Sequence, residues 1–156
     1  RRLKQLGSHY GAMPAHDGLW EAAVATAHDA AARLAVVPIV LEARGLDVTP
    51  MTIERFEVVG DMPTAAILRR ILNDEIVHVA AGTRWFESCC AADRINPENY
   101  WRTLLGRHFR GSIKPPFNDS ARETAGLTRG YYESLAVYGP TGSNQICQSG
   151  GAAPDV

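Results

Sequence analysis

Residues 62–93 read MPTAAILRRILNDEIVHVAAGTRWFESCCAAD and contain one interior glycine and no proline after position 63. Steps of three and four residues along this stretch select one face, made of Leu68, Ile71, Glu75, His78, Gly82, Trp85 and Cys89. This spacing is typical of a helix that packs against its neighbours. The same face is widened by Leu72, Val79 and Phe86, and the opposite, solvated side carries Arg70, Asn73, Asp74, Arg84 and Glu87. We predict a long helix over 62–93 with a carboxylate and an imidazole on its buried face.

Glu75 and His78 are spaced for metal binding. Three residues apart on a helix, their side chains project from one face and can bind the same ion. Burying both groups on an apolar stripe is unfavourable unless something compensates them, and a divalent cation does so effectively. The tetrapeptide EIVH at 75–78, taken alone, also fits a second interpretation, in which a surface glutamate lies beside a capped histidine of the core.

A second long helix is predicted upstream, from an N-cap at Asp17 to about Arg44, with Gly45 as its stop. Its apolar positions alternate in steps of four and three: Trp20, Val24, Ala27, Ala31, Leu34, Pro38 and Leu41. Because proline lacks an N–H group, Pro38 predicts a kink or local unwinding.

Glu42 follows Pro38 by one helical turn and is the second candidate carboxylate. It lies near the small-residue side of the predicted helix, formed by Ala31, Ala35 and Pro38, and can therefore face inward. The alternative is a solvated carboxylate in the last turn, where the helix dipole disfavours a negative charge.

The rest of the chain also reads as helical, so the predicted fold class is all-α. Thr49-Pro50 predicts a short helix to about Val59, and Asn96-Pro97 predicts another to about Phe109. Two short helices are expected at 119–125 and 128–137. From Gly139 onward the sequence is rich in glycine and poor in large apolar residues, which indicates a loose tail. We expect a helical domain over 1–138 and a tail over 139–156.

The composition fits one globular domain. The chain has 156 residues, 46% of them hydrophobic, and 16 basic against 17 acidic side chains give a net charge of -1. Such a balance argues against a dedicated nucleic-acid or membrane-surface binder, and no apolar run is long enough to cross a bilayer. The three cysteines, Cys89, Cys90 and Cys147, lack the spacing of a disulfide framework or zinc site. We expect a reducing, cytoplasmic location.

Two further features have ordinary structural interpretations. Basic residues alternate with aromatic ones between Trp101 and Phe117, through Arg102, Arg107, His108, Phe109, Arg110 and Lys114. This pattern can bind single-stranded RNA, but it is more often a solvated helix face beside core aromatics. His16 and His28 each precede an aspartate and lack a ligand partner at helical spacing, so we expect capping or core roles.

Several segments together resemble a bacterial ferritin-like family of uncharacterised function. They are PAHDGLWE at 14–21, VLEARGLDVTP at 40–50, NDEIVHV at 73–79 with Trp85-Phe86, and FRGSIKPPFN at 109–118. The likeness spans roughly residues 5–137 and implies a four-helix bundle with a carboxylate-bridged di-metal centre, in which two helices each supply a Glu and two each supply Glu-x-x-His. In this resemblance Glu42 matches a single Glu, and Glu75 with His78 matches one Glu-x-x-His.

The chain departs from that pattern because it contains no second Glu-x-x-His and lacks the first two bundle helices, expected before Arg1. Either the chain is part of a longer protein, or a homodimer combines two copies of Glu42, Glu75 and His78. The resemblance implies two Fe ions, with Mn as an alternative, and an O2-dependent oxidase or hydroxylase when complete. Metal storage and a non-catalytic helical interaction module remain the other interpretations, and no catalytic residue is assigned.

Overall fold

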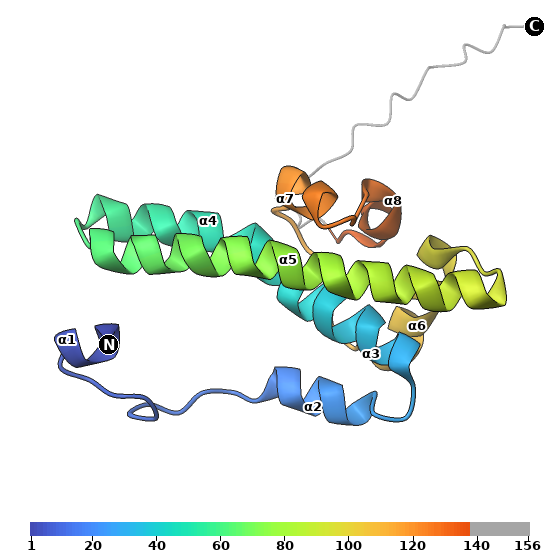
Figure 1. Ribbon diagram of the computed structural model, residues 1–156, viewed down its shortest axis with the longest axis horizontal. Coiled ribbons are helices and arrows are strands. Elements are labelled where there is room, and N and C mark those ends of the chain that lie inside the picture. Colours follow the sequence, from blue (N-terminus) through green and yellow to red (C-terminus); the bar gives the residue numbers. More distant parts are fainter. Residues whose placement is uncertain (138–156) are drawn as a thin grey trace, which may run out of the picture.

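The computed structural model describes residues 1–137, and its regular secondary structure in this range is helical (Figure 1). The elements are α1 (Arg2–Gln5), α2 (Gly18–Ala25), α3 (Ala30–Val36), the π-helix η1 (Val37–Glu42), α4 (Ala43–Val58), α5 (Met62–Asp93), α6 (Pro97–His108), α7 (Asp119–Thr124), α8 (Arg129–Tyr132) and the 3-10 helix η2 (Glu133–Leu135). The all-α prediction is confirmed. The predicted tail lies outside the described residues.

The long elements form a helical hairpin. Figure 1 shows α4 and α5 side by side and joined by a short turn, with α3 and η1 continuing α4 toward the other end of α5. The helix α6 packs against α3 and α5, and α7 contacts α4 and α5. None of the helices described between residues 1 and 137 has the length and hydrophobicity needed to span a bilayer.

The two downstream helices begin where the sequence predicts. The Asp61 carboxylate accepts a hydrogen bond from the backbone N–H of Thr64 at 3.1 Å, and α5 runs over the whole predicted range, Met62–Asp93. The Asn96 side chain accepts from the N–H of Asn99 at 2.9 Å at the start of α6. Both caps satisfy backbone donors that a helix start leaves without partners.

The predicted single helix over 17–44 is wrong because the chain breaks between α2 and α3. The Thr26 hydroxyl donates to the carbonyl of Ala22 at 2.7 Å, where α2 ends. Three residues later the Asp29 carboxylate accepts from the N–H of Ala32 at 3.1 Å and begins α3. Polar side chains that bond the local backbone thus compete with helix continuation.

The start of α2 is also capped differently from the prediction. Asp17 occupies the N-cap position but its side chain makes no capping hydrogen bond. The N–H of Gly18 instead donates to Nδ1 of His16 at 3.2 Å, which confirms a capping role for that histidine.

Gly45 does not end the upstream helix, and Pro50 does not begin a separate one. The helix α4 continues through both residues to Val58. A proline at position 50 has no N–H to donate to the carbonyl of Leu46. The side-chain amide of Asn118 donates to that carbonyl at 3.2 Å and replaces the missing bond. A distant residue therefore allows the helix to pass through a proline.

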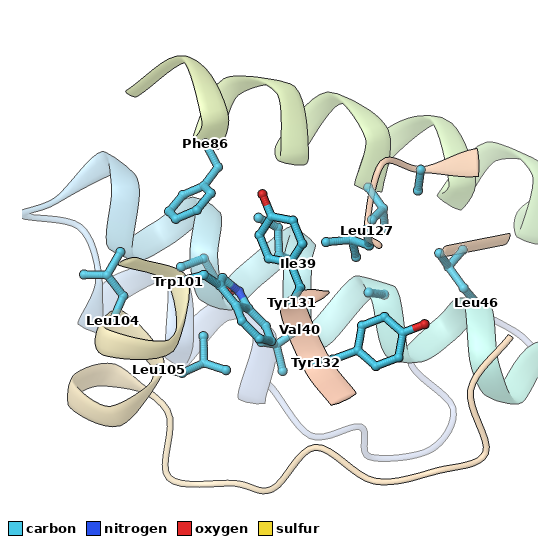
Figure 2. Packing of buried hydrophobic residues seen from close by; sticks show 14 of the residues in the cluster. Ile39, Val40, Leu46, Phe86, Trp101, Leu104, Leu105, Leu127, Tyr131 and Tyr132 are labelled. Carbon is cyan, nitrogen blue, oxygen red and sulfur yellow. The ribbon is translucent and has the colours of Figure 1, made fainter. Parts of the chain in front are cut away.

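The core lies where η1, α5, α6 and the C-terminal helices meet (Figure 2). Figure 2 shows Ile39 and Val40 of η1, Phe86 of α5, and Trp101, Leu104 and Leu105 of α6 around Leu127, Tyr131 and Tyr132. The indole N–H of Trp101 donates to the carbonyl of Ala35 at 3.0 Å, just before the π-helix. This bond satisfies the one polar group of a side chain that is otherwise in the apolar core.

A buried ion pair fastens α7 to α4. The guanidinium of Arg122 donates two hydrogen bonds to the carboxylate of Asp47, at 2.8 and 2.7 Å, and both residues are buried. Asp47 also accepts from the backbone N–H of Asn118 at 3.0 Å. The guanidinium lies over the rings of Tyr132 and Phe117, 4.5 and 5.1 Å from their centroids. The geometry is bidentate, the arrangement that best compensates a buried pair of charges.

Candidate metal site

Glu42 is the last residue of the π-helix η1. Pro38 removes one helical donor, and the predicted local distortion is confirmed as a π-helix over Val37–Glu42. Such turns are uncommon and are often found at functional sites because they shift the side chains that follow out of the α-helical register. The local sequence therefore determines the direction from which the Glu42 carboxylate approaches α5.

Pro38 and Gly82 bring η1 close to α5. A Cβ placed on Gly82 would lie 2.4 Å from the Cβ of Pro38 and 2.6 Å from its Cγ. Carbon atoms normally approach to about 3.5–4.0 Å, so only glycine fits at this position. Gly82 lies one turn after His78 and Pro38 lies one turn before Glu42. The contact thus places the carboxylate of η1 next to the Glu-x-x-His segment of α5.

Glu75 and His78 lie close enough to Glu42 to act on its carboxylate electrostatically. Nδ1 of His78 lies 3.8 Å from Oε2 of Glu75. Burial raises the pKa of Glu42, the negative charge of Glu75 raises it further, and His78 opposes this increase. The structure therefore brings the three predicted ligands into one neighbourhood.

One carboxylate oxygen of this neighbourhood has no hydrogen-bond partner. Oε2 of Glu75 is buried and makes no hydrogen bond. A buried carboxylate oxygen without a donor or cation is unfavourable. The side chain of Glu75 is 29% exposed, so the burial is concentrated on this atom.

The prediction that His78 is buried is wrong for this chain, because its side chain is 60% exposed. The same face of α5 leaves Ile71 and Trp85 exposed, at 44% and 68%. The buried side of α5 is rotated from the predicted stripe and contains Ala65, Val79, Gly82, Thr83, Phe86 and Cys90. The helix packs on η1, α4 and α6, and its predicted stripe lies at the edge of these contacts. The predicted solvated positions Arg70, Asn73, Asp74, Arg84 and Glu87 are all exposed.

The three donors do not form a closed cage. Across residues 1–137, no group of three or more His, Cys, Asp or Glu side chains is placed to hold a metal ion by itself. Two carboxylates and one imidazole are nevertheless a donor set that suits iron or manganese. Coordination of one ion by all three residues requires the side chains to rearrange and further donors to be added.

The other candidate groups are placed in the core or on its border. Trp101 is buried, while Phe109 and Phe117 are half-buried, so the basic and aromatic segment presents no row of exposed aromatic rings. Cys89 and Cys90 are free thiols, and burial raises the pKa of Cys90. Raising a thiol pKa lowers its reactivity. Cys147 lies outside the described residues.

The contact between Pro38 and Gly82 was not predicted. The sequence contains signals for it, a proline inside a helical pattern and the single glycine inside α5. Neither residue shows that the other is its partner, because they are far apart in sequence and meet only after the hairpin closes.

Comparison with known proteins gives a family without an assigned activity. Residues 1–133 match a family described as "Protein of unknown function (DUF455)". An uncharacterized protein of Haemophilus influenzae is 42% identical over 127 residues, which cover 81% of this chain and 44% of that relative. The chain thus spans less than half the length of this relative. No solved structure matches.

Proposed function

The chain belongs to the DUF455 family, whose function is unknown, and from its own side chains we propose that it binds metal as part of a carboxylate-bridged di-metal protein. The proposed ligands are Glu42, Glu75 and His78. The observation that carries the proposal is the buried Oε2 of Glu75, which accepts no hydrogen bond and lies near a second carboxylate whose pKa is raised. A cation at this position would compensate both groups at once.

The donors favour a particular metal class. Carboxylate oxygens and one imidazole suit iron or manganese, whereas thiolate-preferring metals lack a ligand here. Bound iron would supply the redox chemistry with O2 that an oxidase or hydroxylase requires. The chain's own contribution is to hold two carboxylates close together and to keep one carboxylate oxygen away from water.

Further donors must come from outside this set of three residues. We propose that they are supplied either by helices of a longer protein or by a second copy of the chain. Two facts support an additional partner at this face: Ile71 and Trp85 are exposed beside the ligands, and the relative in Haemophilus influenzae is more than twice as long as the matched region. Large apolar side chains left exposed on both sides of a site are consistent with a surface that another element covers.

The first test measures metal per chain and solution mass together. The purified chain is loaded with Fe²⁺ without oxygen, desalted, and analysed by elemental analysis and light scattering. We expect retained iron, and we expect Glu75→Gln and His78→Ala to lose most of it with unchanged helical content. Asp74→Asn is the matched control, since Asp74 is an exposed carboxylate on the same helix. Equal iron in the parent and both ligand variants would refute the site.

A second measurement separates the possible activities. Storage requires many subunits around a cavity and rapid oxidation of Fe²⁺ without a co-substrate, whereas an oxygenase requires an organic substrate. Light scattering together with a simple Fe²⁺ oxidation assay distinguishes them. A purely structural role for the three side chains predicts that chelators leave the Tm unchanged, because no bound metal would stabilise the fold.

A further inference from the structure

Two histidines from distant parts of the chain meet where the loop before α3 approaches the end of α6. His28 lies in the loop between α2 and α3, and His108 is the last residue of α6. Their ring centroids are 5.6 Å apart and the ring planes are tilted by 52°. His28 is exposed and His108 is half-buried, so solvent reaches the pair. Figure 1 shows this loop passing next to α6.

The positions of both residues are fixed by neighbouring hydrogen bonds. The loop carrying His28 is bounded by Thr26, which bonds the end of α2, and by Asp29, which caps α3. After His108, the N–H of Phe109 donates to the carbonyl of Leu105 at 2.9 Å and completes the last turn of α6. Within the described range, neither imidazole makes a hydrogen bond to the protein. The two rings are therefore held near each other while their nitrogens stay free.

We propose that His28 and His108 form a second metal site that takes one late divalent transition-metal ion, in the class of Cu²⁺, Ni²⁺ and Zn²⁺. Imidazole nitrogen suits these ions, and the Irving–Williams order places Cu²⁺ highest among them. The site differs from Glu42, Glu75 and His78 in its donors, because it has two nitrogens and no committed carboxylate. Water fills the remaining coordination positions.

The distance between the rings fits a shared ion. With metal–nitrogen bonds of about 2.0–2.1 Å, the ion lies about 3.2 Å from each ring centroid. Two rings then have centroids about 5.2 Å apart on a tetrahedral ion such as Zn²⁺, and about 4.5 Å apart at adjacent positions of a tetragonal ion such as Cu²⁺. From the observed 5.6 Å, the two rings must therefore approach each other by about 0.4–1.1 Å. The ring planes are tilted by 52°, so the two imidazoles are not stacked face to face.

An ion at this position would fasten the α2–α3 loop to the end of α6. Because the ligands meet only in the folded chain, binding would stabilise the folded state. At a Zn²⁺ concentration one hundred times its Kd, we expect the Tm to rise by roughly 5–10 °C for a chain of this size.

The test uses Cu²⁺ alone and a chain that also carries Glu75→Gln and His78→Ala, so that the first site does not compete. Titration should give one tight Cu²⁺ per chain, with an electron paramagnetic resonance spectrum of two imidazole nitrogens. His28→Ala and His108→Ala should each weaken binding at least tenfold. The double variant should be no weaker than either single variant, because both changes destroy the same site.

Two control variants separate loss of the Cu²⁺ site from unspecific effects of a substitution. His16→Ala, which removes an exposed histidine near the N-terminus, should leave the Cu²⁺ affinity unchanged. His108→Gln replaces the half-buried ring with a polar side chain if the alanine variant unfolds. Unchanged Cu²⁺ affinity in His28→Ala or in the folded His108 variant would overturn the proposal, as would a spectrum with one imidazole. The Fe²⁺ measurement at Glu42, Glu75 and His78 is separate, so either metal site can be refuted without the other.

Discussion

Replacing Gly82 with alanine tests the contact that positions the proposed metal ligands. In an ordinary helix, Gly→Ala stabilises a protein by about 0.5–1 kcal/mol because alanine loses less backbone entropy on folding. At position 82 the new methyl group would lie 2.4 Å from Cβ of Pro38. The proline ring cannot rotate away, since it is closed onto the backbone. Either η1 or α5 must therefore move by about 1 Å.

The cost is that of overpacking a core, about 1–3 kcal/mol. Gly106→Ala is the matched control, since Gly106 lies in α6 and a Cβ there meets nothing within 4 Å. Both variants share the gain in helix propensity, so the free energies of unfolding should differ by about 1–3 kcal/mol. Urea denaturation measures this difference as a shift of the midpoint by about 0.5–1.5 M for a typical slope.

The same change should weaken metal binding, because a shift of Pro38 also moves Glu42, one turn further along η1. We expect Gly82→Ala to retain less Fe²⁺ than Gly106→Ala under identical loading. Equal stability of the two alanine variants would refute the close approach of η1 and α5. Equal stability together with equal iron would also remove the reason to place Glu42 in the site.

Three further changes test other parts of the structure. Asp47→Ala leaves the buried guanidinium of Arg122 without its partner. It should lower the free energy of unfolding, measured in urea, by about 3–5 kcal/mol. A loss below about 1 kcal/mol would contradict the buried pair. Because the folded pKa of Glu42 is raised above 4.5, the folded state binds more protons there, and stability should fall as the pH rises through that pKa. Glu42→Gln should therefore gain stability over the parent at neutral pH but not at acid pH, as followed by the Tm of both proteins without metal. Trp101→Phe removes the N–H that bonds a carbonyl of α3 and should cost about 1–3 kcal/mol by urea denaturation, whereas an unchanged midpoint would show that this bond contributes nothing.

Local chemistry explains which parts of the fold could be predicted. Asp61 and Asn96 each precede a helix and accept hydrogen bonds from its first turn. The start of each helix was therefore determined by a residue directly before it. The π-helix after Pro38 follows from a missing donor at that same position. These features depend on neighbours in sequence, and sequence reasoning found them.

Features that depend on distant residues were predicted incorrectly. Pro50 looked like the start of a helix because it has no N–H to donate to the carbonyl of Leu46 and no neighbour in sequence can replace that donor. Asn118 donates to this carbonyl instead. The exposure of the His78 side chain depends on which other helices pack over that face of α5. No residue near position 78 determines which helices do so. The proposed ligands were chosen by spacing and resemblance; the structure adds the proximity of Glu42, but their role stays a prediction.

The bond from Asn118 to Leu46 has a consequence for how the chain acquires its shape. The carbonyl of Leu46, in the first turn of α4, is bonded by an amide that is synthesised 72 residues later. Until the segment around position 118 arrives, the hairpin of α4 and α5 has a weak point at Pro50, where water must occupy the vacant acceptor. Amide hydrogen exchange should accordingly report faster opening on both sides of Pro50 in an Asn118→Ala chain than in the parent, while the centre of α5 keeps its protection.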